Sequence, residues 1–199
     1  MFDIRFDTIL ARGDIQALTR KLSSKNVNKA TASAMNRSVS SGRTKASAII
    51  RAEYRIKKRD LDKNMGTSKA GAKHLKATLY AHGSPLALGN FGFTKVKKGV
   101  KVRVKGKATL IPGAFVATMK SGHKGVFARG RYTSTGFEFR KKRVSKKGND
   151  LPITRLNTLS QGAMLRQPKV IKPVMRRVND MLEKRIKHEL YRLINGYGV

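Results

Sequence analysis

The spacing of apolar residues changes twice along this chain, and these changes limit the fold more than any single motif does. Apolar and small residues recur every three or four positions from Val27 to Arg55, which predicts a long helix. From Ala72 onward the spacing becomes two residues, which is typical of strands. Helical spacing returns in a final segment over 170–195. This order predicts an α+β fold, with N-terminal helices and a long C-terminal helix packed on a central antiparallel β-sheet.

The length of 199 residues fits one domain, at roughly 150 residues per domain. We expect a single α+β domain over residues 1–199. Its regions are an N-terminal extension (1–25), a helical part (26–66), a basic β-sheet region (72–140), a loop (141–169) and the C-terminal helix (170–195). Within the extension, residues 2–10 alternate as a short strand would, and Asp14 suits the N-cap of a following helix.

The predicted helix over 27–55 carries small residues, such as Gly42 and Ala46, on its apolar stripe. Small residues permit the close approach of another helix, so we expect tight packing against a partner helix. One more helical turn is expected over 59–64. A stretch with glycine and serine over 65–71 is then expected to break the helical pattern.

The clearest strand runs from Val100 to Lys105, where three valines alternate with three cations. This alternation predicts a half-buried strand with a cationic outer face. A strand over 93–97 precedes it, and Lys98-Gly99 is expected as the two-residue hairpin turn between them. Further strands are expected over 75–81, 114–119, 125–129 and 136–140.

Charge indicates the kind of partner that the chain needs. The 45 Lys and Arg residues outnumber the 11 Asp and Glu residues and leave a formal net charge of +34. Residues 94–148 alone hold 17 cations against the single acid Glu138, which is nearly half of the excess. Such a charge predicts association with polyanions. Nucleic acid, an anionic membrane and acidic protein surfaces are all candidates.

Side chains on the outer face of the 100–105 strand repeat about every 6.6 to 6.8 Å, so they could meet alternate phosphates of a DNA strand. Any polar strand face has this period, and a solvated face is the alternative. The final helix, with cations around an apolar stripe, could instead lie on an anionic membrane, or pack on the sheet or on a neighbouring subunit. The candidate contacts to DNA or an acidic partner are Lys95, Lys97, Lys98, Lys101, Arg103, Lys105, Lys107, Arg140, Lys141, Lys142 and Arg143.

Motifs for catalysis or metal binding all lack a required residue. Cys is absent and the four His are dispersed, which leaves no zinc set. Asp60 to Asn64 begins like a calcium loop, but Met65 occupies the glycine position. There is no Gly-x-Ser-x-Gly elbow, no signal peptide at the start and no apolar run of about 20 residues. We therefore expect no enzyme activity, no cofactor and no membrane insertion.

Several short sequence motifs occur in a fixed order along the chain. Ala34-Met-Asn-Arg37 lies in the first long helix, and Ile50-Arg-Ala-Glu-Tyr-Arg-Ile56 follows. Leu110-Ile-Pro-Gly-Ala-Phe115 comes next, with Met119-Lys-Ser-Gly122 after it, and Leu151-Pro-Ile153 precedes the final basic helix. Their order, spacing and shared basicity over most of residues 26–195 resemble the minor tail protein Z family, the tail-completion proteins of lambda-like phages. The first 25 residues and the stretch 81–92 lie outside the resemblance.

The resemblance implies a noncatalytic structural protein of the virion, assembled in the host cytoplasm and placed at the head-proximal end of the tail. It implies other tail and neck proteins as partners, namely the tail terminator, the tail tube and the connector. We expect a closed homo-oligomeric ring, as a hexamer, that supports head–tail joining and DNA passage and touches genomic DNA nonspecifically.

In this interpretation Pro112-Gly113 forms a fixed turn before the 114–119 strand. The candidate assembly contacts are Ile111, Pro112, Gly113, Ala114, Phe115, Val178, Leu182 and Ile186. The alternative, from another functional class, is a general nucleic-acid-binding or packaging protein that contacts phosphates through its basic sheet.

Overall fold

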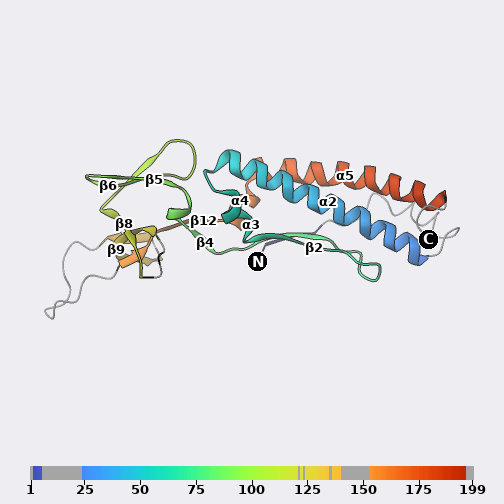
Figure 1. Ribbon diagram of the computed structural model, residues 1–199, viewed down its shortest axis with the longest axis horizontal. Coiled ribbons are helices and arrows are strands. Elements are labelled where there is room, and N and C mark those ends of the chain that lie inside the picture. The colour runs from blue at the N-terminus through green and yellow to red at the C-terminus, as the bar shows by residue number, and fades with distance from the viewer. Residues whose placement is uncertain are drawn as a thin grey trace. The chain divides into compact units, whose positions relative to one another are not determined.

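The computed structural model describes residues 2–5, 24–120, 122, 124–134, 136–139 and 153–195. The chain divides into two compact units. The first comprises residues 1–50, 61–83 and 161–199, and the second comprises residues 51–60 and 84–160. Figure 1 labels several elements of each unit. The single domain over 1–199 stays a prediction.

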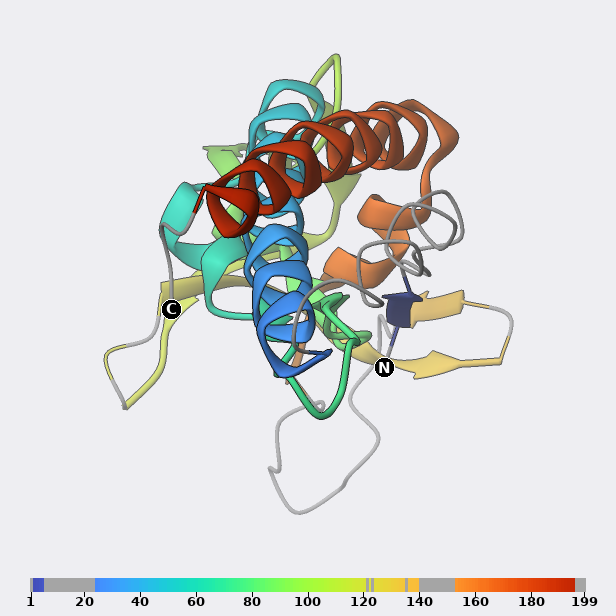
Figure 2. The same ribbon diagram turned by 90° about the vertical axis from the view of Figure 1, so that its right-hand side faces the viewer.

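Two long helices, α2 (Ser24–Glu53) and α5 (Pro168–Ile194), form the main part of the first unit. They lie side by side in both ribbon views (Figures 1 and 2). The helices approach each other closely at Gly42, where an added Cβ atom would lie less than 3.0 Å from Cγ2 of Val178. The long helix predicted over 27–55 and its close packing are thus confirmed, and the partner helix is α5 of the same chain.

Two buried hydroxyl groups of α2 bond to the backbone of their own helix. Thr31 is 3% exposed and donates to the carbonyl oxygen of Val27 at 2.9 Å. Ser38 is 1% exposed and donates to the carbonyl oxygen of Ala34 at 2.7 Å. Each bond spans four residues along the helix, which lowers the cost of burying these two hydroxyl groups. The hydroxyl of Ser47, which is also buried on α2, has no hydrogen-bond partner among the described residues.

A three-stranded antiparallel sheet also belongs to the first unit. Its strands are β1 (Phe2–Arg5), β2 (Met65–Ser68) and β3 (Thr78–Ala81), in the order β1-β3-β2. Helix α4 (Gln161–Arg166) contacts β3. The predicted end of the helical pattern at 65–71 is confirmed, because α3 ends at Asp62. The strand β2 within this stretch was not predicted; Met65 is buried there and pairs with Ala81 at the start of a regular ladder. The strand predicted over 75–81 is confirmed from residue 78.

The predicted basic strand lies in the second unit, in a sheet of β5 (Gly92–Val96), β6 (Gly99–Arg103) and β7 (Thr109–Pro112). Its alternation is confirmed, since Val100 and Val102 are buried whereas Lys101 and Arg103 are exposed. The hairpin turn lies one residue earlier than predicted, at 97–98, because Gly99 already pairs with a residue on each neighbouring strand.

Strand β9 (Lys124–Thr133) is the centre of a second sheet in this unit. It pairs antiparallel with β8 (Ala114–Thr118), β10 (Gly136–Phe139) and β11 (Ile153–Arg155). The strands predicted over 114–119, 125–129 and 136–140 are therefore confirmed. Gly113 has a φ of +74° immediately before β8, which agrees with the predicted turn.

The expectation of a loop over 141–169 is wrong for the residues that the structure describes there. Besides β11 and α4, they contain β12 (Asn157–Ser160), which pairs with β4 (Pro85–Ala87). Leu156 is 5% exposed, and its amide donates to the carbonyl oxygen of Val126 at 3.0 Å. Strands of three or four residues are too short to show a period in the sequence. They are recognised only in the folded chain, from their pairing and from the burial of Leu156 between β11 and β12.

The remaining elements are helix α3 (Lys58–Asp62), where one turn was predicted, and the 3₁₀ helix η2 (Leu88–Asn90). The α+β class and the antiparallel pairing are confirmed, although the described strands form four sheets in place of one central sheet. The helix predicted after Asp14 lies outside the described residues. The two units have separate apolar cores, which include Leu79 and Val174 in the first and Val100 and Val126 in the second.

Candidate anion-binding surface

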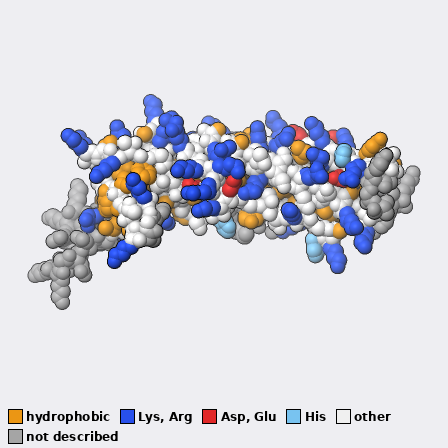
Figure 3. Space-filling model, in the orientation of Figure 1, with side chains coloured by type: hydrophobic (Ala, Val, Ile, Leu, Met, Phe, Trp, Pro, Cys, Tyr) orange, Lys and Arg blue, Asp and Glu red, His pale blue; other side chains and the backbone are white. Residues whose placement is uncertain are grey.

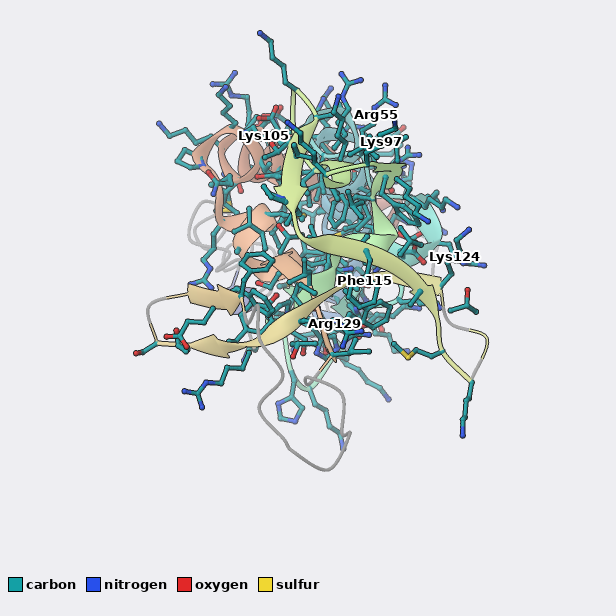
Figure 4. All side chains as sticks on the ribbon, turned by 90° about the vertical axis from the view of Figure 1, so that its left-hand side faces the viewer. Arg55, Lys97, Lys105, Phe115, Lys124 and Arg129 are labelled. Carbon is teal, nitrogen blue, oxygen red and sulfur yellow. The ribbon has the colours of Figure 1, made fainter. Side chains whose placement is uncertain are left out.

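The β5–β6 hairpin presents a group of cations that its fold holds apart from the core. Lys95, Lys97, Lys98 and Lys101 are all exposed, and Lys97 and Lys98 form the turn itself. On β6, burial of the valines turns Lys101 outward. We call these four residues the hairpin lysines. Figure 4 labels Lys97 among them.

The described acids of the second unit have nearby cations elsewhere. Each of these carboxylates lies within 4 Å of an Arg or Lys nitrogen, and no described Asp or Glu forms an ion pair with a hairpin lysine. The three pairs are Glu53–Lys105, Asp60–Arg59 and Glu138–Arg131. The charge of the hairpin lysines is therefore not neutralised by the described part of the chain, and the hairpin is a candidate site for an external anion.

Lys105, which was predicted to continue the row of Lys101 and Arg103, has a different role. Its Nζ lies 2.5 Å from Glu53 Oε1 and 5.5 Å from the centre of the Tyr54 ring. The hydrogen bond to Glu53 raises the pKa of Lys105 above its ordinary value. Lys105 therefore differs from the hairpin lysines in that it forms an ion pair with the end of α2.

The other predicted anion contacts divide into two groups. Arg103 and Lys107 are exposed, and Arg103 Nε donates to the carbonyl oxygen of Gly106 at 2.5 Å. The remaining four, Arg140, Lys141, Lys142 and Arg143, lie outside the described residues.

An aromatic cluster adjoins the predicted turn and was not predicted as a site. Pro112 and Gly113 are exposed, and a Cβ atom on Gly113 would lie 3.7 Å from the Phe139 ring. Phe139 packs edge-to-face on Phe137 at 4.9 Å between ring centres, and Phe137 packs likewise on Tyr132 at 5.0 Å. Phe139 is 44% exposed and Tyr132 is 46% exposed, so this apolar surface faces solvent. The sequence predicted a strand over 136–140 but not an exposed aromatic surface on it.

The other predicted contacts after this turn are less accessible. Ile111 and Phe115 are half-buried and Ala114 is buried. The guanidinium of Arg129 lies 6.0 Å from the centre of the Phe115 ring, and Figure 4 labels both residues. Phe115 also lies 6.4 Å from Phe127 between ring centres, so its ring is part of the internal packing of the sheet.

Two of the three assembly contacts predicted on α5 lie on the buried side of this helix. Val178 is 1% exposed and Ile186 is 7% exposed, while Leu182 is half-buried. The apolar stripe is occupied inside the chain, so Val178 and Ile186 offer no surface to another subunit in this structure. Sequence periodicity identifies such a stripe but not the protein chain that covers it.

A groove of about 410 Å³ in the first unit brings together cations that sequence reasoning did not select. It lies between α2, α5 and the residues after β2. Its lining is formed by Asn36, Arg37, Ser40, Lys69, Met181 and Arg185. The motif Ala34-Met-Asn-Arg37 contains two of these residues, Asn36 and Arg37. Lys69 and Arg185 come close to them only in the folded chain.

Over the whole visible face in Figure 3, Lys and Arg side chains far outnumber Asp and Glu. Among the described residues, no cluster of three or more His, Asp or Glu side chains could hold a metal ion. None of the helices described combines the length and the apolar character needed to cross a membrane.

Comparison with known proteins agrees with the resemblance found in the sequence. The family model described as prophage minor tail protein Z (GPZ) matches residues 12–195, which is most of the chain. No curated protein and no solved structure matches it. The chain therefore belongs to the prophage minor tail protein Z family, whose members are structural proteins of phage tails, and its place is in the virion among other tail proteins.

Proposed function

We propose that this protein is a tail-completion or neck component at the head-proximal end of the tail. It forms a closed ring there, expected to be a hexamer, which supports head–tail joining and the passage of DNA. Its partners are the tail terminator, the tail tube and the connector, and it acts without catalysis or a cofactor. Family membership supports a location in the phage tail. The hairpin lysines support a position beside a partner of dense negative charge.

The observation that carries the proposal is the uncompensated charge of the hairpin lysines. Four exposed cations lie on one hairpin, while the described acids of the same unit lie beside other cations. Like charges at this density repel one another, and an external polyanion removes that cost. At the head-proximal end of a tail, the polyanion is the DNA that passes through it or an acidic neighbouring ring.

The exposed aromatic cluster supports an assembly contact. Apolar surface that remains exposed on a folded unit marks contact sites between proteins. Pro112, Gly113 and Phe139 share this surface with Tyr132, and it replaces the α5 stripe as the candidate contact between subunits. A ring forms when such a contact joins two different patches and the rotation closes.

Deletion of this protein from its phage tests the role directly. The proposal expects full heads and finished tails that accumulate without joining, counted by electron microscopy, and a loss of infectious particles. Density for the chain should lie at the top of the tail. Normal yields of infectious particles, or density only at the distal tip, would overturn the proposal.

Complementation of the deletion then tests the hairpin. A variant with all four hairpin lysines changed to Gln should give unjoined particles. The control removes the same charge from exposed cations of α2 and α5 and should restore joining. Its substitutions are Lys45→Gln, Arg51→Gln, Lys172→Gln and Arg176→Gln. Equal loss in both variants would assign the effect to total charge and not to the hairpin.

The subunit contact is tested with a single charge on the aromatic cluster. Phe139→Glu should abolish ring formation, measured by light scattering of the purified protein under assembly conditions. Leu75→Glu places the same charge on a 38% exposed residue of the other unit and should leave the ring intact. If the unaltered protein is a monomer under these conditions, the proposal that it forms a ring is wrong.

A general nucleic-acid-binding protein is the second candidate, and the exposed hairpin lysines favour it, because Lys side chains on a protein surface bind the phosphates of DNA. This candidate requires tight binding of duplex DNA without other tail proteins, with affinity that falls steeply as salt rises. A neck protein binds its acidic ring neighbours better than DNA at the same salt. Competition between the two in one titration separates the candidates.

A further inference from the structure

The groove between α2 and α5 is a second cationic surface, separate in sequence from the hairpin and in the other unit. Arg37 comes from α2, Arg185 from α5 and Lys69 from the segment after β2. None of these three cations forms an ion pair with a described Asp or Glu, and no acid lines the groove. Three cations around one hollow attract an anion into it.

The position of Lys69 depends on a specific pair of hydrogen bonds. The amide of Ala70 donates to Asn36 Oδ1 at 2.7 Å, and Asn36 Nδ2 donates to the carbonyl oxygen of Ala70 at 3.0 Å. These two bonds attach the backbone after β2 to α2, directly beside Arg37. Both polar atoms of the Asn36 side chain thus bond to Ala70, which places the neighbouring Lys69 at the groove.

A second hollow on the same helix pair shows how the chain neutralises cations when it does so internally. This hollow of about 180 Å³ is lined by Lys29 and Arg192, but also by Glu189. Glu189 is 7% exposed, accepts a hydrogen bond from Ser33 at 3.2 Å and lies 3.5 Å from Arg192. One hollow thus contains a buried carboxylate from the chain itself, and the other has the cations without one.

We propose that the groove of Arg37, Lys69 and Arg185 binds the carboxylates of an acidic segment from another protein. A volume of about 410 Å³ is in the range of sites for small ligands or a few side chains. Guanidinium groups bind carboxylates in a fixed, two-bond geometry, and Met181 offers an apolar contact for the methylenes of Glu.

The carboxylate preference follows from the groove alone. Only the identification of the partner as a tail protein rests on the function proposed above. The binding assay below contains no phage protein other than this chain. A negative result there would not count against a role in head–tail joining, and normal joining without this protein would not count against the groove as a binding site.

The test titrates the full chain with a hexaglutamate peptide at about 0.3 M salt, where weak attraction to the overall charge is screened. Methyl NMR of labelled Met reads the groove, because Met181 lines it. Met181→Leu identifies the signal among those of the seven Met residues. The Met181 signal should shift with hexaglutamate and stay in place with hexaglutamine, while the signal of buried Met35 does not change.

Arg37→Gln combined with Arg185→Gln should weaken hexaglutamate binding by roughly tenfold or more, since charge-assisted hydrogen bonds are lost. The control, Lys45→Gln with Arg176→Gln, removes two exposed charges from the same helices and should change binding by less than about twofold. Circular dichroism checks that both variants keep their helices. If the first variant loses helix, Lys69→Gln replaces it and should also weaken binding.

Equal weakening by the variant and its control would overturn the proposal, as would a Met181 signal that does not respond to hexaglutamate. A duplex DNA that shifts Met181 at lower concentration than the peptide would also overturn it, because the preferred anion would then be the phosphate of a nucleic acid.

Discussion

The close approach of α2 and α5 at Gly42 can be tested by adding a methyl group at this position. A Cβ atom there would lie less than 3.0 Å from Val178 Cγ2, whereas carbon atoms in contact prefer about 3.5 to 4.0 Å. Val178 is 1% exposed and branched at Cβ, so it cannot simply turn away. Overpacking in Gly42→Ala should therefore cost about 1 to 3 kcal/mol. The higher helix propensity of Ala returns about 1 kcal/mol.

A double-mutant cycle separates these two effects. Val178→Ala removes the methyl groups that obstruct the new Cβ, so Gly42→Ala in that background should stabilise the protein by about 1 kcal/mol. In the unaltered background the same change should be neutral or destabilising by up to about 2 kcal/mol. The coupling between the two sites should thus be about 1 to 3 kcal/mol, which is the overpacking cost alone.

The assay is urea denaturation followed by helical circular dichroism, which gives the free energy of unfolding of the four proteins in the cycle. The cost of Val178→Ala itself cancels, because it is present in both arms that are compared. If Gly42→Ala has the same effect in both backgrounds, within about 0.5 kcal/mol, the helices do not meet at this point and the packing described here is wrong.

Three further predictions concern the second unit. Gly99 has a φ of +152°, and an added Cβ would overlap a carbonyl oxygen of β7, so Gly99→Ala should destabilise the β6–β7 pairing by about 1 to 3 kcal/mol in hydrogen exchange. Gly92→Ala, in open space, is its control, and equal effects would contradict the reasoning. In Glu53→Gln the pKa of Lys105, followed by NMR of Nζ, should fall toward its ordinary value of 10.5; an unchanged pKa would exclude the pair in solution. Because the pKa of Lys105 is raised on folding, the stability lost in this variant should be present below 10.5 and disappear as pH rises through the raised value. In duplex DNA binding, Lys101→Gln should reduce the slope of log affinity against log salt by about one, whereas Lys105→Gln should not, and equal slopes would show that both cations contact phosphates.

The helices and most strands could be predicted because their signals are local. A period of three to four residues over 27–55 and over 170–195 needs only the neighbouring residues to be visible. The alternation of Val100 and Lys101 is equally local. Elements without a signal of their own were missed. β2 and β12 have four residues each, and what defines them is pairing with another strand, β3 for β2 and the distant β4 for β12.

The candidate site was predictable only in part, for a related reason. Exposure of the hairpin lysines follows from the pattern of one hairpin. The pairing of Lys105 with Glu53 joins residues that the sequence separates widely, so the sequence did not show that this cation has an internal acid beside it. The burial of Val178 against Gly42 of α2 likewise joins residues that are far apart in the sequence.

The sequence by itself determined the two long helices, the antiparallel strands and the excess of positive charge. Periodicity depends only on residues that are near one another in the sequence, and net charge is a sum over all residues. Only the tertiary structure decided which cations lie beside an internal acid and which remain for a partner. Glu53 approaches Lys105 and Glu189 approaches Arg192, whereas Arg37 and Arg185 meet across a groove without an acid. The physical reason is that electrostatic attraction acts over a few ångströms in space, and the fold alone sets which charges come that close.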